Sequence, residues 1–117
     1  METAGRHFMA DYFDCEISLL TDRAFLCDLL RKAAKKAGAT IVQEFCHPKG
    51  NGLSIGVIVE ESHLILHTNP DMGIVIGDFY TCGTTANPKH AHEEIIKALK
   101  CQRCQTRLFE RGIPGLL

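Results

Sequence analysis

Residues 60–68 read EESHLILHT, and residues 78–83, which read DFYTCG, complete the segment around which the chain is organised. Aliphatic and β-branched residues flank Glu61-Ser62-His63 on both sides, so this tripeptide interrupts two strand-like runs. A serine between an acid and an imidazole is an unusual choice for an ordinary hairpin turn. With Cys82 nearby, the segment offers a hydroxyl, imidazoles and a thiol, the groups used for nucleophilic and proton-transfer chemistry.

Outward from this segment, apolar and alternating runs predict a chain rich in strands. The expected strands cover residues 5–13, 40–46, 53–60, 62–68, 74–81 and 102–110. His63 and His67 would share one face of their strand only if its pairing has no bulge, because side chains alternate along a strand. Proline and glycine predict a loop over 47–52 and a turn over 69–73, and residues 112–117 are expected to form a loose tail.

Two helices complete the pattern. Apolar residues recur at three- and four-residue spacing over 21–37, and Gly38 is placed to end that helix. Asn87-Pro88 has the form of an N-cap followed by a first-turn proline. Short connections between strands predict an α+β fold, a two-layer sandwich in which a largely antiparallel sheet carries both helices on one face. The other face needs cover, and a second copy of the chain, giving a homodimer, is the natural supplier.

Composition narrows the class of protein. The 117 residues are expected to form a single domain, with 45% hydrophobic and 23% charged residues. A net charge of −1 gives no electrostatic case for binding nucleic acid or an anionic membrane. Without a long apolar run or a signal-peptide pattern, cytoplasmic residence is expected, and the six cysteines are expected to be free thiols.

Three motifs then carry a family resemblance. Glu61-Ser62-His63, His67-Thr68 and Thr81-Cys82-Gly83 together resemble the signature of bacterial and archaeal S-adenosylmethionine decarboxylases. Further matches are Gly5-Arg6-His7, residues 38–42 (GATIV) and Gly52-Leu53-Ser54, so the resemblance covers nearly the whole chain. It implies a pyruvoyl-dependent decarboxylase of polyamine biosynthesis that acts on a small amino acid substrate. The pyruvoyl cofactor would come from Ser62 by self-cleavage into chains 1–61 and 62–117.

The resemblance also implies roles for individual residues. The Ser62 hydroxyl attacks the Glu61 carbonyl to form an ester, and loss of the Ser62 α-proton eliminates it. His67 is the candidate for removing that proton, and Cys82 for returning a proton to the substrate carbanion after decarboxylation. Decarboxylation needs an electron sink, which the pyruvoyl ketone supplies by forming a Schiff base with the substrate amine.

Substrate preference is where the chain departs from the family pattern. A tryptophan usual two residues after His67 is Asn69 here, and aromatic residues of the loop before the third strand are replaced by Pro48 and Asn51. Stacking of a base on an aromatic ring is worth ~1–3 kcal/mol in nucleic-acid sites. The sequence therefore slightly favours L-arginine or L-ornithine, with S-adenosylmethionine as the alternative.

The residues predicted to bind substrate are Ser54, Asn69 and Asp71. Asp71, Asp78 or Glu60 could pair with a basic side chain, and Phe8, Tyr12, Phe13, Phe79 or Tyr80 could replace the missing rings.

Other interpretations remain open at this point. Singly, Ser62 could be a turn serine, His67 a structural histidine and Cys82 a small buried hydrophobe. Cys101 and Cys104 have the spacing of a zinc knuckle, but no second cysteine pair accompanies them, so no metal site is expected. A regulatory, unprocessed relative is a further alternative, against which the intact Ser62, His67 and Cys82 argue.

Overall fold

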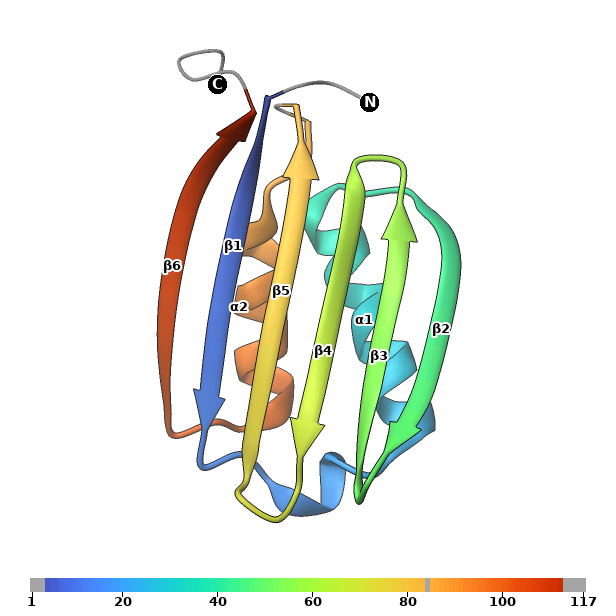
Figure 1. The fold of residues 1–117 in the computed structure, drawn as a ribbon, viewed down its shortest axis with the longest axis vertical. Coiled ribbons are helices and arrows are strands. Elements are labelled where there is room, and N and C mark those ends of the chain that lie inside the picture. The colour runs from blue at the N-terminus through green and yellow to red at the C-terminus, as the bar shows by residue number, and fades with distance from the viewer. Residues whose placement is uncertain (1–3, 84, 113–117) are drawn as a thin grey trace.

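The computed structural model describes residues 4–83 and 85–112, which form one six-stranded sheet with two helices (Figure 1). The elements in chain order are β1 (Ala4–Phe13), a 3₁₀ turn (Ile17–Leu19), α1 (Arg23–Ala37), β2 (Ile41–Lys49), β3 (Gly52–Val59), β4 (Ser62–Asn69), β5 (Ile74–Cys82), α2 (Pro88–Leu99) and β6 (Arg103–Gly112). The strand order is β2-β3-β4-β5-β1-β6, and every neighbouring pair is antiparallel. Both helices lie behind the sheet in Figure 1. The predicted α+β sandwich is confirmed.

Local signals in the sequence explain both helix ends. Helix α1 begins after Asp22, whose carboxylate accepts the N–H of Phe25, and ends at Gly38, which has a φ of 79°. The prediction began this helix two residues early and missed the 3₁₀ turn before it, because the Asp22 cap lay inside the predicted span. Helix α2 follows Asn87, whose side chain accepts the N–H of Lys89, as the Asn-Pro signal predicts.

The edge strand β2 is longer than predicted. Residues 47–49 continue the strand instead of forming a loop, so the connection to β3 consists of Gly50 and Asn51 alone. Pro48 is tolerated because β2 is an edge strand, where a missing N–H need not break a ladder on both sides. Strand β6 reaches Gly112, so the expected tail does not begin there, and residues 113–117 lie outside the described part of the chain.

The core lies between the sheet and the helices. Alternate residues of the four central strands face it, and α1 and α2 contribute their apolar stripes. The side chains with the largest fully buried volumes are Tyr12, Leu20, Leu26, Leu30, Ile55, Val57, Leu64, Leu66, Val75, Phe79, Ile95 and Leu99. Burial of this kind contributes roughly 1.5–3 kcal/mol for each large apolar side chain, so the sheet's inner face is strongly specified.

The outer face of the sheet carries the alternate side chains that point away from the core, and no helix covers it (Figure 1). The register places Ile58, His63, Tyr80, His7 and Phe109 in one row across five strands. A second row contains Ser54, His67, Ile76 and Asp11. No register shift interrupts β4, so His63 and His67 do share this face.

Candidate functional site

The turn between β3 and β4 consists of Glu60 and Glu61 and is anchored from outside the hairpin. The main-chain N–H of Glu60 donates to the carbonyl oxygen of Thr40 at 2.9 Å. The main-chain N–H of Thr40 donates in return to a carboxylate oxygen of Glu61 at 3.1 Å. Thr40 lies in the connection between α1 and β2, so this connection holds both turn residues in place.

The peptide bond between Glu61 and Ser62 has the features expected of a reactive site. Ser62 has a φ of 148°, a backbone conformation that glycine adopts far more readily than a residue with a side chain. The carbonyl oxygen of Glu61 accepts a 2.7 Å hydrogen bond from the main-chain N–H of Cys82. A donor aimed at this oxygen polarises the carbonyl and would stabilise negative charge developing on it during attack.

Thr81 belongs to the Thr81-Cys82-Gly83 motif, but no role of its own was predicted for it from the sequence. It pairs with Ser62 across β4 and β5 and is fully buried. Its hydroxyl has no hydrogen-bond partner in the described part of the chain, which costs about 1–3 kcal/mol for a buried polar group. The adjoining Cys82 is also buried. The site thus combines a main-chain donor with an unused hydroxyl beside the strained serine.

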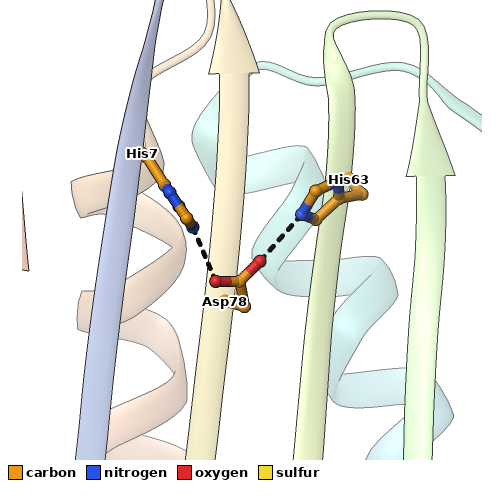
Figure 2. A network of polar contacts seen from close by, with 3 residues as sticks. All are labelled: His7, His63 and Asp78. Carbon is orange, nitrogen blue, oxygen red and sulfur yellow. Dashed lines mark hydrogen bonds and ion pairs between the residues drawn. The ribbon is translucent and has the colours of Figure 1, made fainter. Parts of the chain in front are cut away.

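Next to this turn, Asp78 joins two histidines on the outer face of the sheet (Figure 2). His7 Nε2 lies 2.6 Å from one carboxylate oxygen of Asp78, and His63 Nε2 lies 2.9 Å from the other. Burial opposes ionisation of Asp78, but the hydrogen bonds and charges of the two imidazoles outweigh it and lower the pKa of its carboxyl. The carboxylate therefore fixes the ring of the residue that follows Ser62. Because Asp78 serves two imidazoles, it is a poor candidate for pairing with a basic substrate.

His67 and Ser54 form a separate pair farther along the sheet. They are partners across β3 and β4, and the Ser54 hydroxyl lies 2.8 Å from His67 Nδ1. His67 is five residues beyond Ser62 in an uninterrupted strand, which at roughly 3.3 Å per residue is about 16 Å. The chain therefore holds its predicted catalytic residues in two groups, with Ser62 and Cys82 at one end of the sheet and His67 with Ser54 towards the other.

Asn69 and Asp71 lie at that second end, Asn69 as the last residue of β4 and Asp71 in the β4–β5 turn. With the β2–β3 turn they line a polar depression of about 310 Å³. The side-chain amide of Asn51 donates to both carboxylate oxygens of Asp71 at 3.3 Å, and the Asn69 side chain accepts the N–H of Met72. The predicted substrate-binding residues Ser54, Asn69 and Asp71 thus gather near His67 and away from Ser62.

The aromatic residues considered as replacements for the missing rings divide between the two faces. Phe8, Tyr12 and Phe79 are buried in the core, so they have no surface to offer a ligand. Tyr80 is half-buried on the outer face, with its ring centre 6.1 Å from that of His7 and 6.2 Å from that of His63. Among these candidates, Tyr80 is the ring that lies beside the strained turn.

No group of three or more His, Cys, Asp or Glu side chains suited to a metal ion occurs in residues 4–83 and 85–112. Cys101 does have a close partner, Cys15, at 3.0 Å between sulfur atoms. In the same described ranges, no helix is both long and apolar enough to cross a membrane.

Known proteins that resemble this chain in sequence and in fold carry the name of one family. Residues 6–112 match the model of the S-adenosylmethionine decarboxylase family. The S-adenosylmethionine decarboxylase proenzyme of Thermotoga petrophila is 36% identical over 113 residues, which span 96% of this chain and 87% of the relative. The proenzyme of the same name from Acidithiobacillus ferrooxidans is 37% identical, with 96% and 85% covered. The crystal structure of the adenosylmethionine decarboxylase from Aquifex aeolicus aligns with a TM-score of 0.87 at 27% identity, covering 100% of this chain and 98% of the other.

A strained serine within an antiparallel sheet and these matches together define the class: the chain is an enzyme, a decarboxylase of the pyruvoyl-dependent type. It belongs to the S-adenosylmethionine decarboxylase family.

Proposed function

We propose that this chain cleaves itself between Glu61 and Ser62 and then decarboxylates S-adenosylmethionine for polyamine biosynthesis. The products of cleavage would be chains 1–61 and 62–117, with a pyruvoyl group at position 62. The observation that carries the proposal is the 2.7 Å hydrogen bond from the Cys82 N–H to the Glu61 carbonyl, next to a serine with a φ of 148°. A strained peptide with a polarised carbonyl is what attack by the neighbouring hydroxyl requires.

In the cleavage reaction, the Ser62 hydroxyl adds to the Glu61 carbonyl carbon while the Cys82 N–H stabilises the charge on its oxygen. The carbon–nitrogen bond then breaks, which converts the peptide to an ester and frees the Ser62 amine. Removal of the Ser62 α-proton expels the Glu61 carboxylate, and hydrolysis of the resulting enamine releases ammonia and leaves the ketone. Strain at Ser62 is relieved along this route, which favours it over the uncleaved chain.

The surroundings of Ser62 fit a pyruvoyl group. The Thr81 hydroxyl is buried opposite Ser62 and has hydrogen-bonding capacity to spare, so it could hold a carbonyl oxygen there. When present, the group supplies the electron sink that decarboxylation of an α-amino acid needs. Cys82 is buried beside Thr81, and its thiol is our candidate for returning a proton to the substrate carbon.

His67 would act on Ser62 from a second copy of the chain. A general base must lie within about 2.6–3.2 Å of its proton or reach it through one water. Along strand β4, His67 is about 16 Å from Ser62 of its own chain. A two-fold axis on the outer face would set the Ser62 end of one sheet against the His67 end of the other, because an isologous contact pairs each end with its opposite.

The outer face has the character of a surface that a second copy would cover. The register places Phe45, Ile58, Ile76 and Phe109 on this side of the sheet, and their side chains are 38–51% exposed. Large apolar side chains gathered on one sheet face are typical of interfaces. In such a homodimer, each site would combine Ser62 and Cys82 of one subunit with Ser54, His67, Asn69 and Asp71 of the partner subunit.

For the substrate, support comes from the relatives, whose names specify S-adenosylmethionine. Nothing in the comparisons supports the preference for arginine or ornithine that the missing aromatic residues suggested. Two of the acids that could pair with a basic substrate already have partners in the chain: Asp78 bonds to two histidines, and Asp71 accepts hydrogen bonds from Asn51. Tyr80 offers a half-buried ring next to the reactive turn, where it could contact an adenine.

Cleavage and substrate can be tested separately. Denaturing electrophoresis and intact-mass measurement of the purified protein should give two fragments, the second beginning with a pyruvoyl group. Ser62→Ala should give one intact chain, whereas Ser18→Ala, which changes an exposed serine, should cleave normally. Carbon dioxide release should then be measured with S-adenosylmethionine, arginine, ornithine and lysine. Cleavage of Ser62→Ala at the same bond would refute the assigned nucleophile, and turnover of arginine or ornithine alone would refute the assigned substrate.

A further inference from the structure

Cys15 and Cys101 meet at the end of the sheet opposite to the Glu61–Ser62 bond. Cys15 follows β1 and Cys101 lies between α2 and β6, yet their sulfur atoms are 3.0 Å apart and both are free thiols. Main-chain hydrogen bonds fix both segments. The Glu16 N–H donates to Leu99 at 3.2 Å, and the Gln102 N–H donates to Phe13 at 3.2 Å. The two sulfur atoms are thus held together by the fold on both sides.

The two thiols differ in chemistry. The hydrogen bond between the two thiols lowers the pKa of Cys15, although burial opposes this, and the same hydrogen bond together with burial raises the pKa of Cys101. Of the two thiols, Cys15 is therefore the one that loses its proton more readily. Its residue is 6% exposed, which admits a small oxidant in preference to a bulky one, and Cys101 is half-buried beside it. A thiolate with a second thiol in contact is the arrangement of a reversible oxidation site.

We propose that Cys15 and Cys101 form such a site, which a hydroperoxide closes to a disulfide. The Cys15 thiolate attacks one oxygen of hydrogen peroxide, the O–O bond breaks, and hydroxide leaves, so that Cys15 becomes a sulfenic acid. The Cys101 sulfur then attacks the Cys15 sulfur and its proton leaves with the departing hydroxyl as water. Two thiols lose two electrons in total, and the peroxide is reduced to water.

The consequence depends on the proposed cleavage. Cys15 belongs to residues 1–61 and Cys101 to residues 62–117, so their disulfide would join the two products covalently. Without it, the products are held together by the pairing of β1 with β5 and β6 and of β3 with β4. The disulfide would therefore keep the two chains of the mature protein together under conditions that unfold it, and a thiol reductant would release them.

Cys104 provides the matched control. It is exposed, lies three residues beyond Cys101, and pairs with Tyr12 across β1 and β6. A disulfide between Cys101 and Cys104 would connect residues of the same product and would leave the two chains separable. Cys104→Ser removes that possibility without touching the proposed pair, whereas Cys101→Ser and Cys15→Ser each remove one partner.

The test treats reduced, purified protein with hydrogen peroxide, caps the remaining thiols, and compares denaturing gels with and without reductant. Wild type and Cys104→Ser should each run as one full-length species without reductant and as two fragments with it. Peptide mapping should find Cys15 linked to Cys101. Cys101→Ser should give two fragments with and without reductant. Cys15→Ser, which removes the other partner, should give the same two fragments. A Cys101–Cys104 link, or no disulfide in Cys104→Ser, would overturn the proposal.

Ser62→Ala separates this proposal from the cleavage on which its consequence rests. The uncleaved variant should lose the mass of two hydrogens on oxidation and yield the same Cys15–Cys101 peptide. If it does and the wild type is never cleaved, the thiol pair stands and the proposed processing fails. If the wild type is cleaved and neither protein forms the link, the processing stands and the thiol pair fails.

Discussion

The main-chain N–H of Cys82 lies 2.7 Å from the carbonyl oxygen of Glu61 and donates a hydrogen bond to it. The last residue of β5 thereby contacts the residue immediately before Ser62 at the start of β4. Because the donor belongs to the backbone, the polarisation of this carbonyl does not depend on the thiol. The two functions proposed for Cys82, activating the peptide and returning a proton, are therefore separable by mutation.

Cys82→Ala should keep self-cleavage and lose decarboxylation. The N–H remains after the substitution, whereas the proton donor is removed, and general acid catalysis of this kind contributes ~10²–10⁴-fold. Gel analysis should show two fragments, and carbon dioxide release or correct protonation of the product should fall by about that factor. An uncleaved Cys82→Ala chain that is still folded would show that the thiol itself is needed for processing.

Co-expression should reveal whether His67 acts across two subunits. Ser62→Ala and His67→Ala chains should each remain uncleaved alone. In mixed dimers, Ser62 of the His67→Ala chain would face the intact His67 of the partner subunit, so that chain should be cleaved. Differently tagged chains allow each to be followed by mass. His47→Ala, which alters an exposed histidine of β2, is the control and should cleave alone. Absence of rescue in isolated mixed dimers would exclude action from the partner.

Asp78→Asn should remove an acid-sensitive part of the stability. The pKa of Asp78 is lower in the folded chain than its ordinary value, so its ionised form stabilises the fold above the unfolded-state pKa of about 3.9. That contribution should disappear as the pH falls below about 4 through the folded-state pKa. Urea unfolding between pH 3 and 7 should therefore show a difference between wild type and Asp78→Asn at neutral pH that shrinks in acid. If the difference in the free energy of unfolding between wild type and Asp78→Asn were constant with pH, this account would be contradicted. The control is Asp28→Asn, which changes an exposed carboxylate of α1.

Thr81→Val tests the unused hydroxyl beside Ser62. Replacing a buried, unpaired hydroxyl with a methyl group of similar shape should stabilise the uncleaved chain by about 1 kcal/mol. If the hydroxyl assists the reaction at Ser62, the same variant should cleave more slowly. Stability is best measured in a Ser62→Ala background, where cleavage cannot interfere, and the cleavage rate in the otherwise wild-type chain. A variant that is less stable and cleaves normally would assign the hydroxyl a structural role.

Much of the fold follows from local patterns. Gly38 and Asn87-Pro88 mark helix ends that the structure reproduces, and the alternating runs place the strands in the correct order along the chain. The error at residues 47–49 arose because proline and glycine usually mark loops, whereas an edge strand accommodates Pro48. Local signals cannot distinguish an edge strand from a central one, since that depends on which strands pair.

Sequence patterns predicted only part of the candidate site. Ser62, His67 and Cys82 were proposed as catalytic residues because their motifs resemble the family signature. The predicted strand over 62–68 already contained both Ser62 and His67, but the sequence did not show which residues of other strands or of a second copy lie beside each of them. Asp78 and Thr81 acquired their significance from strand register, which sets His7 and His63 on either side of the carboxylate. Cys15 and Cys101 are 86 residues apart, and no local pattern relates them.

The sequence by itself indicated the class of chemistry, through the resemblance of its motifs to a known family, and the segments that form helices and strands, because these segments depend on neighbours within a few residues. Tertiary structure alone decided which groups can act on one another. Pairing of distant strands sets the Cys82 N–H against the Glu61 carbonyl and holds Ser62 in a strained conformation. The extended backbone of β4, which the sequence predicts, separates His67 from Ser62 by about 16 Å, and strand pairing decides that Ser54 lies beside His67 and Thr81 beside Ser62.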